Sequence, residues 1–141
     1  MSRSEGVYGA HRIRESLNSS EWDVRRAAAR ALGTLLPDSD ALSDLTALLR
    51  DEDIAVQQEA AESLSRYGGR TGLAIVLTEL GLRAEDADAD ADYIAYRLRE
   101  LQIFEQLPIL RTARDMTAEL TADARAGLDQ LEELFGTHFP A

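Results

Sequence analysis

A run of alternating acids is the part of this 141-residue sequence that looks most able to bind a ligand. Its carboxylates are Glu85, Asp86, Asp88, Asp90 and Asp92. The run resembles the start of a calcium loop, which also needs glycine at position six and a bidentate acid at position twelve. Counted from Asp86, these positions hold Ala91 and Arg97, and the register from Asp88 fails too. We therefore expect no calcium site, and two interpretations stay open: a solvated loop before a helix, or an acidic patch that meets a basic partner.

Other reactive groups are sparse. His11 and His138 have no metal-ligating neighbours at a useful spacing. The glycine-rich segment 68–72 lacks the lysine of a phosphate-binding loop, and the chain has neither lysine nor cysteine. A turn between two helices explains it better. We predict that the protein is not an enzyme and has no catalytic residue, cofactor or metal.

The charge excludes some classes of partner. Fifteen arginines face 26 acids, which gives a net charge of −11. Residues 1–36 carry +2 and residues 37–141 carry −13. This balance argues against nucleic-acid binding, which needs clustered cations. No apolar run reaches the roughly 18–20 residues of a membrane span. The first twelve residues lack the apolar core of a signal peptide, so we expect a cytoplasmic protein without membrane contact.

The sequence repeats with a period of 32 residues. The segment 24–33 aligns with the segment 56–65, and apolar columns recur at this step. Their members are Ile13, Leu45, Leu77 and Ile109; Val24, Val56 and Leu120; Ala28, Ala60 and Ala124, with Leu32, Leu64 and Leu128 one turn further on. Columns of this kind indicate stacked structural units.

Each unit is predicted to contain two helices. Val24, Ala28, Ala31, Leu32 and Leu35 have the spacing of a buried helical stripe. The next unit offers Val56, Ala60, Leu64 and Tyr67, and the partner helix offers Leu42, Leu45, Leu48 and Leu49. Breaks are expected at Pro37-Asp38, at Asp51-Glu52-Asp53 and at Gly68-Gly69. No segment alternates like a strand.

The segment 19–67 resembles HEAT repeats, especially the short bacterial type also found in phycobilin lyase-like proteins. The shared pattern is carried by Asp23, Val24, Arg25, Ala28, Ala29, Ala31, Leu32 and Gly33. The second copy departs from it, because Gln57 replaces the arginine and Ser65 replaces the glycine. The resemblance implies an all-α fold, an α-solenoid of about 7–8 helices stacked as antiparallel hairpins. It also implies that Arg25 pairs with acids of a neighbouring unit.

The frame predicts one domain, residues 1–141. It comprises a half unit at 5–20, repeats at 21–52 and 53–84, an irregular repeat at 85–116 and a last helix at 117–136. In the irregular repeat, Ile94, Leu98, Leu101 and Phe104 form the better core stripe, and Pro108 begins the partner helix. The segment 73–82 is apolar nearly all round. It is expected to lie in mid-stack, or else to expose an apolar groove.

A candidate partner-binding face follows from the second helix of each unit. With the Ile13 column turned inward, a step of about 100° per residue turns other positions outward. These are Tyr8, His11, Glu15, Ser43, Ala47, Arg50, Ile75, Glu79, Leu82, Arg111 and Arg114. The mixture of apolar and charged groups suits a protein partner, although an ordinary solvated face has the same composition.

We therefore predict a non-enzymatic interaction or scaffold module that is a monomer or a weak homodimer. A sharper form is an acidic inhibitor or immunity-type protein that blocks a basic protein. One alternative is a bilin lyase-like or chaperone-like helper with a ligand in a helical groove. The other is a purely structural subunit that self-associates through the segment 73–82.

Overall fold

The computed structural model describes residues 12–85 and 91–135, and every regular element in these ranges is helical. A short helical segment covers residues 12–16. The helices that follow are α2 (Trp22–Gly33), α3 (Ser39–Leu48), α4 (Ile54–Tyr67), α5 (Gly69–Glu85), α6 (Ala91–Glu105), α7 (Ile109–Asp115), the 3-10 helix η1 (Thr117–Glu119) and α8 (Ala122–Phe135). The acid run falls mostly on residues 86–90, outside the described ranges, so its structural role stays a prediction.

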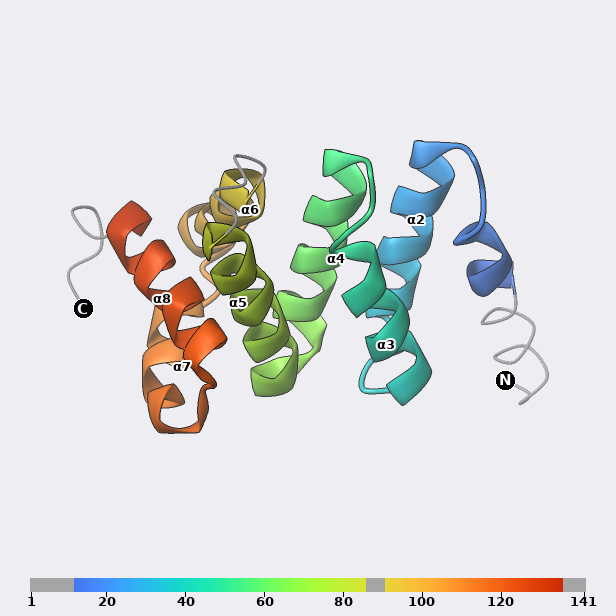
Figure 1. The fold of residues 1–141 in the computed structure, drawn as a ribbon. Coiled ribbons are helices and arrows are strands. Elements are labelled where there is room, and N and C mark those ends of the chain that lie inside the picture. The colour runs from blue at the N-terminus through green and yellow to red at the C-terminus, as the bar shows by residue number, and fades with distance from the viewer. Residues whose placement is uncertain (1–11, 86–90, 136–141) are drawn as a thin grey trace.

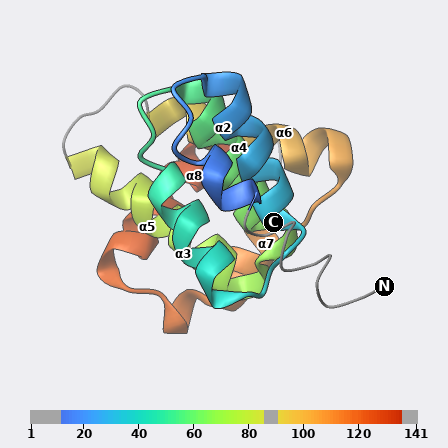
Figure 2. The ribbon, with the colours of Figure 1, turned by 90° about the vertical axis from the view of Figure 1, so that its right-hand side faces the viewer.

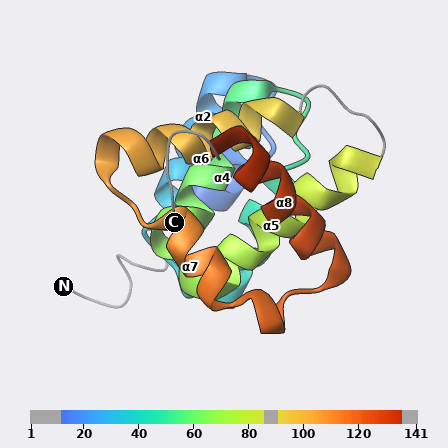
Figure 3. The same cartoon turned by 90° about the vertical axis from the view of Figure 1, so that its left-hand side faces the viewer.

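The helices stack as hairpins along one axis (Figure 1). The first helices of successive units, α2, α4 and α6, lie side by side, and the second helices, α3, α5 and α7, form another layer. This arrangement confirms the predicted all-α solenoid. The last helix departs from strict repetition, because α8 lies across α5 and packs chiefly against it (Figure 3).

The repeat columns form the core. Leu45, Leu77 and Ile109 are buried, and Ile13 packs against the same cluster. The alanine column and the leucine column that contains Leu64 are buried throughout. A 32-residue step therefore returns to the same face of the equivalent helix, because each unit adds one hairpin of nearly constant size.

Carboxylates cap two of the helices, each at a position where the sequence predicts a break. Asp38 caps α3 by accepting a hydrogen bond from the backbone N–H of Ala41 at 2.9 Å. Asp53 caps α4 by accepting one from Ala55 at 2.9 Å. These bonds satisfy N–H groups that have no partner inside the helix. Pro108 is the N-cap of α7, which confirms the expected restart of the frame.

Four expectations are wrong in detail. Val24 is exposed, because α2 is the first full helix of its layer in the described chain. Tyr67 is exposed at the last residue of α4. Phe104 is exposed because it lies ten residues after Ile94, about 80° away around the helix. The last helix starts late: η1 precedes it, and α8 begins only at Ala122.

Two glycines bring α5 and α8 into backbone contact. A Cβ on Gly81 would lie 1.8 Å from the carbonyl oxygen of Asp123, and one on Gly127 would lie 1.9 Å from that of Leu77. No side chain fits at either distance, so the absence of Cβ atoms permits the close crossing. Val76, Leu77 and Leu80 of α5 are fully buried, and the segment 73–82 is largely buried in mid-stack as expected.

Candidate partner-binding groove

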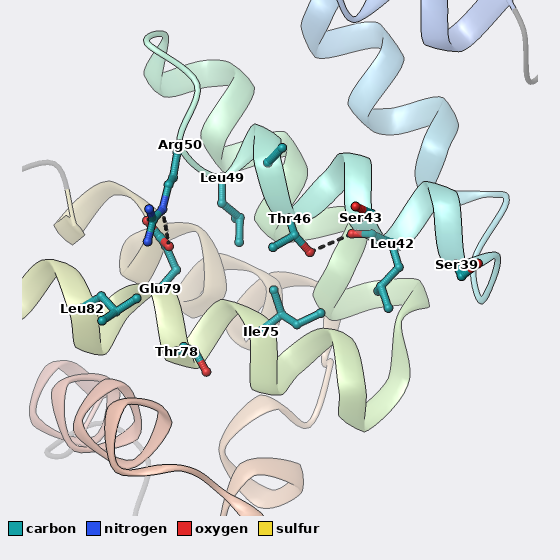
Figure 4. A pocket seen from close by; sticks show the side chains of 11 residues that line it. Ser39, Leu42, Ser43, Thr46, Leu49, Arg50, Ile75, Thr78, Glu79 and Leu82 are labelled. Carbon is teal, nitrogen blue, oxygen red and sulfur yellow. Dashed lines mark hydrogen bonds and ion pairs between the residues drawn. The ribbon is translucent and has the colours of Figure 1, made fainter.

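A groove lies between α3 and α5. Its cavity volume is about 630 Å³. Figure 4 shows Leu42 and Leu49 extending from the α3 side and Ile75 extending back from α5. The lining residues are Ser39, Leu42, Ser43, Thr46, Ala47, Leu49 and Arg50 on one side and Ile75, Thr78, Glu79 and Leu82 on the other.

The floor of the groove is apolar and its rim carries hydroxyls. Leu49 is fully buried, and Leu42 and Ile75 are partly buried against the core. The hydroxyls of Thr46 and Thr78 donate to backbone carbonyls of their own helices, at 2.7 Å and 2.8 Å. The threonine methyl groups and the leucine side chains therefore form an apolar surface. Covering this surface with an apolar group would release water and is favourable.

An ion pair closes one end of the groove. Arg50 Nε lies 3.1 Å from Glu79 Oε2, and the Arg50 side chain is 65% exposed. Arg83, which is buried, donates from its Nε to the other carboxylate oxygen of Glu79 at 3.0 Å. Glu79 is itself buried, which corrects its prediction as an outward-facing residue. Two guanidinium groups offset the cost of burying its charge.

A polar network links this end of the groove to the neighbouring unit. Arg83 Nη1 donates to Gln57 Oε1 at 3.0 Å, and Arg83 also donates to the Leu49 carbonyl. The amide of Gln57 donates to the Asp51 carbonyl. The carboxylate of Asp51 accepts two bonds from Arg25, at 2.9 Å and 3.0 Å. Arg25 thus pairs with an acid, but Asp51 belongs to the same repeat, 21–52, and not to a neighbouring unit as the resemblance implies. These bonds raise the pKa of the Arg25 guanidinium.

The groove brings together most of the predicted face. Ser43, Ala47, Arg50, Ile75, Glu79 and Leu82 all line it. Glu15 and Arg111 do not, and Arg114 pairs with Glu132 of α8 at 3.1 Å instead. Tyr8 and His11 lie outside the described residues, and so do the side chains of the acidic patch: Glu85, Asp86, Asp88, Asp90 and Asp92.

Five lining residues were not singled out from the sequence. Two of them, Leu42 and Leu49, have the leucine spacing of a core helix. Leu49 is buried beneath the groove, and only the position of α5 leaves part of the Leu42 surface in it. The other three are Ser39, Thr46 and Thr78. Ser39, Ser43, Thr46 and Arg50 follow each other at steps of four, three and four, which is one helical face. That spacing could have indicated them.

The described residues and one family match define the class of protein. Among residues 12–85 and 91–135, no three His, Cys, Asp or Glu side chains are grouped as a metal site needs. None of the described helices is long and apolar enough to cross a membrane. A family profile described as HEAT repeats matches residues 11–96, which is more than half of the chain. The chain belongs to the HEAT-repeat family. Searches of curated proteins and of solved structures found no significant match.

Proposed function

We propose that this chain is a non-enzymatic interaction module that binds a segment of another protein along the groove between α3 and α5. HEAT repeats generally mediate protein–protein interaction or scaffolding. The observation that carries the proposal is the groove itself, where six residues selected on helical phase from two helices form one surface. The groove combines an apolar floor with a charged end. Surfaces of this composition accept the apolar and arginine side chains that contribute most of the binding free energy at interfaces.

The proposed occupant is an amphipathic helix. Its apolar stripe would contact Leu42, Ile75 and Leu82, and its polar flank would meet the serine and threonine rim. The net charge of −11 favours a partner that is basic around this stripe. A basic flank gains from long-range attraction at low salt, and the apolar stripe supplies the short-range free energy.

A crosslinking experiment tests the groove. A photoreactive amino acid at Ala47 should capture a partner in the native host, whereas the same group at the exposed Ala27 of α2 should not. With that partner purified, Ala47→Arg should weaken binding by about tenfold or more, the scale of one lost interface anchor. Ala27→Arg changes the charge equally and should bind like the native protein. Equal affinity of the two variants would refute the groove.

A sharper form of the proposal is an inhibitor or immunity-type protein whose acidic surface covers a basic protein. The sequence supports it through the five acids at 85–92 and the −13 of residues 37–141. Replacing Asp86, Asp88, Asp90 and Asp92 with asparagine should slow association and flatten its dependence on salt. Unchanged association rates would remove the acidic patch from the interface and leave the groove proposal standing.

One alternative has an observation in its favour. The groove volume of about 630 Å³ falls within the roughly 300–1,000 Å³ of small-molecule sites. A lyase-like or chaperone-like helper would use that space for a bilin or a similar ligand. Titration with biliverdin, followed by absorbance, separates the two functions. Saturable one-to-one binding that Ala47→Arg abolishes would favour the helper, and absence of saturation would favour the protein-binding module.

Self-association is the other alternative. Most of the apolar segment 73–82 is already covered by other helices of the same chain, which leaves the groove-facing residues Ile75 and Leu82 for a second copy.

Our proposal is a monomer or weak homodimer, a single domain over residues 1–141 and a cytoplasmic location. One continuous hydrophobic core across the described helices supports the single domain. Light scattering at micromolar concentration checks the oligomeric state.

A further inference from the structure

The outer face of α6 carries an aromatic stripe that the groove does not use. Phe104 is 78% exposed, and Tyr93 and Tyr96 are each exposed by nearly half. With Glu100, these residues follow steps of three, four and four, so they share one face of the helix. Exposure of aromatic rings to water is unfavourable, and a partner that covers them removes this cost. Such rings are enriched at protein interfaces.

A shallow depression lies at the end of this stripe, where α4 and α6 adjoin. Its volume is about 210 Å³, and it is lined by Glu62, Arg97, Glu100, Leu101, Phe104 and Glu105. Arg66 bonds to Glu62 and Glu105, and Arg97 lies 3.5 Å from Glu62. An apolar ring and three carboxylates therefore share one small surface.

The exposed charge of this depression is negative. The side chain of Glu100 is 54% exposed, whereas that of Arg97, its partner at 3.7 Å, is 22% exposed. Glu105 is likewise more exposed than Arg66. Glu100 and Glu105 therefore lie nearer to solvent than the guanidinium groups, whereas Glu62 is as little exposed as Arg97, so an approaching group meets the carboxylates of Glu100 and Glu105 beside a phenyl ring.

We propose that this depression binds an arginine side chain presented by a partner protein. A guanidinium group is planar and can stack on Phe104 while it donates to Glu100. Lysine offers a compact, strongly hydrated charge and lacks the planar face. Tyr93 and Tyr96 continue the stripe along α6 and cover the residues that flank the arginine in the partner.

This surface is separate from the groove. In Figures 2 and 3, α6 lies on one side of the stack and α5 on the other. The two surfaces share no lining residue. One chain therefore offers two docking surfaces of different chemistry, which is what a scaffold that joins two partners needs.

The test uses a short peptide of alternating arginine and glycine, titrated into the 15N-labelled protein. The expected result is a set of amide shifts centred on Glu62, Arg97 and residues 100–105. Phe104→Ala leaves the net charge unchanged and should weaken binding by about fivefold or more, the range of one cation–π contact. The same peptide with lysine in place of arginine should bind several-fold more weakly.

Matched variants separate this site from general attraction to an acidic protein. Trp22→Ala removes an exposed aromatic from α2, and Glu133→Gln removes an exposed acid from α8. Neither should change binding, whereas Glu100→Gln should weaken it. Shifts spread over the whole surface, equal binding of the lysine peptide, or native affinity of Phe104→Ala would each overturn the proposal. Thermal melting should show both Phe104→Ala and Glu100→Gln fully folded, because both side chains are exposed.

Discussion

Gln57 accepts a hydrogen bond from Arg83 at 3.0 Å, across the same 26-residue separation that joins Arg25 to Asp51 in the preceding unit. Each residue of the first pair is replaced 32 positions later, so the donor has moved from the first helix to the end of the second. Successive repeats thus keep a polar contact at one place and reverse its direction. Arg25, Gln57 and Arg83 are all buried, so both units keep this polar contact away from solvent.

Substitutions at positions 57 and 83 test whether this polar contact can be reversed. Gln57→Arg alone should destabilise the protein, because it places two buried guanidinium groups together. Adding Arg83→Asp recreates the Arg–Asp pair of the first unit, but it also removes the buried guanidinium from Glu79, so the double variant should be destabilised by less than the sum of the two single losses. We expect a coupling free energy of about 1 kcal/mol or more in a double-mutant cycle, measured by urea unfolding. Additive effects would show that the two positions are independent.

The two arginines that bind Glu79 should contribute differently to the free energy of unfolding, because one is buried and the other is exposed. Arg83→Met removes the buried partner and leaves Glu79, Gln57 and a backbone carbonyl short of a donor, so we expect a loss of about 3–5 kcal/mol. Arg50→Met removes the exposed partner of the same carboxylate and should cost at most about 1 kcal/mol. Chemical denaturation of both variants measures the difference, and equal losses would contradict the burial argument.

Ala60 provides a test of the repeat frame. It is fully buried between helices, so Ala60→Asp places an unpaired charge in the core and should cost several kcal/mol, with ~3 kcal/mol as a lower estimate. The matched control is Ala27→Asp, on the exposed face of α2, which should change the unfolding free energy by less than about 0.5 kcal/mol. An unchanged melting temperature for Ala60→Asp would mean that the frame is misplaced.

The crossing of α5 and α8 predicts an unusual sign for glycine replacement. Gly→Ala in an open helix stabilises by about 0.5–1 kcal/mol. Gly127→Ala should instead destabilise by at least about 1–3 kcal/mol, because its Cβ meets the Leu77 carbonyl and forces the helices apart. Asp129→Ala, at an exposed position of the same helix, controls for helix propensity. A more stable Gly127→Ala protein would rule out the close crossing.

A single domain should unfold in one step. The only tryptophan, Trp22, reports on the start of α2, whereas far-ultraviolet circular dichroism reports on all helices. Coincident urea transitions from the two signals are expected for one cooperative unit. Separate midpoints would divide the chain into independent parts and contradict the single domain.

The sequence alone determined the class of fold. Small and apolar residues at a 32-residue period predict the helical hairpins, their order and the buried columns, because a stack of similar units must bury equivalent positions. Local chemistry also predicted the break at Asp51–Asp53 and the helix start at Pro108, and the family resemblance implied that Arg25 pairs with an acid. All of these depend on residues that are close in sequence or one repeat apart.

Only the tertiary structure decided how the helices meet outside the repeat. The lateral separation of α3 and α5 decides that Leu42 and Ile75 line a groove. The guanidinium groups of Arg50 and Arg83 both bond to Glu79, and this pairing allows its carboxylate to be buried. The exposed stripe of Phe104 follows from the phase of α6, and the path of α8 follows from two glycines that admit a close crossing. These features depend on distances between helices, and one helical pattern is compatible with many such distances.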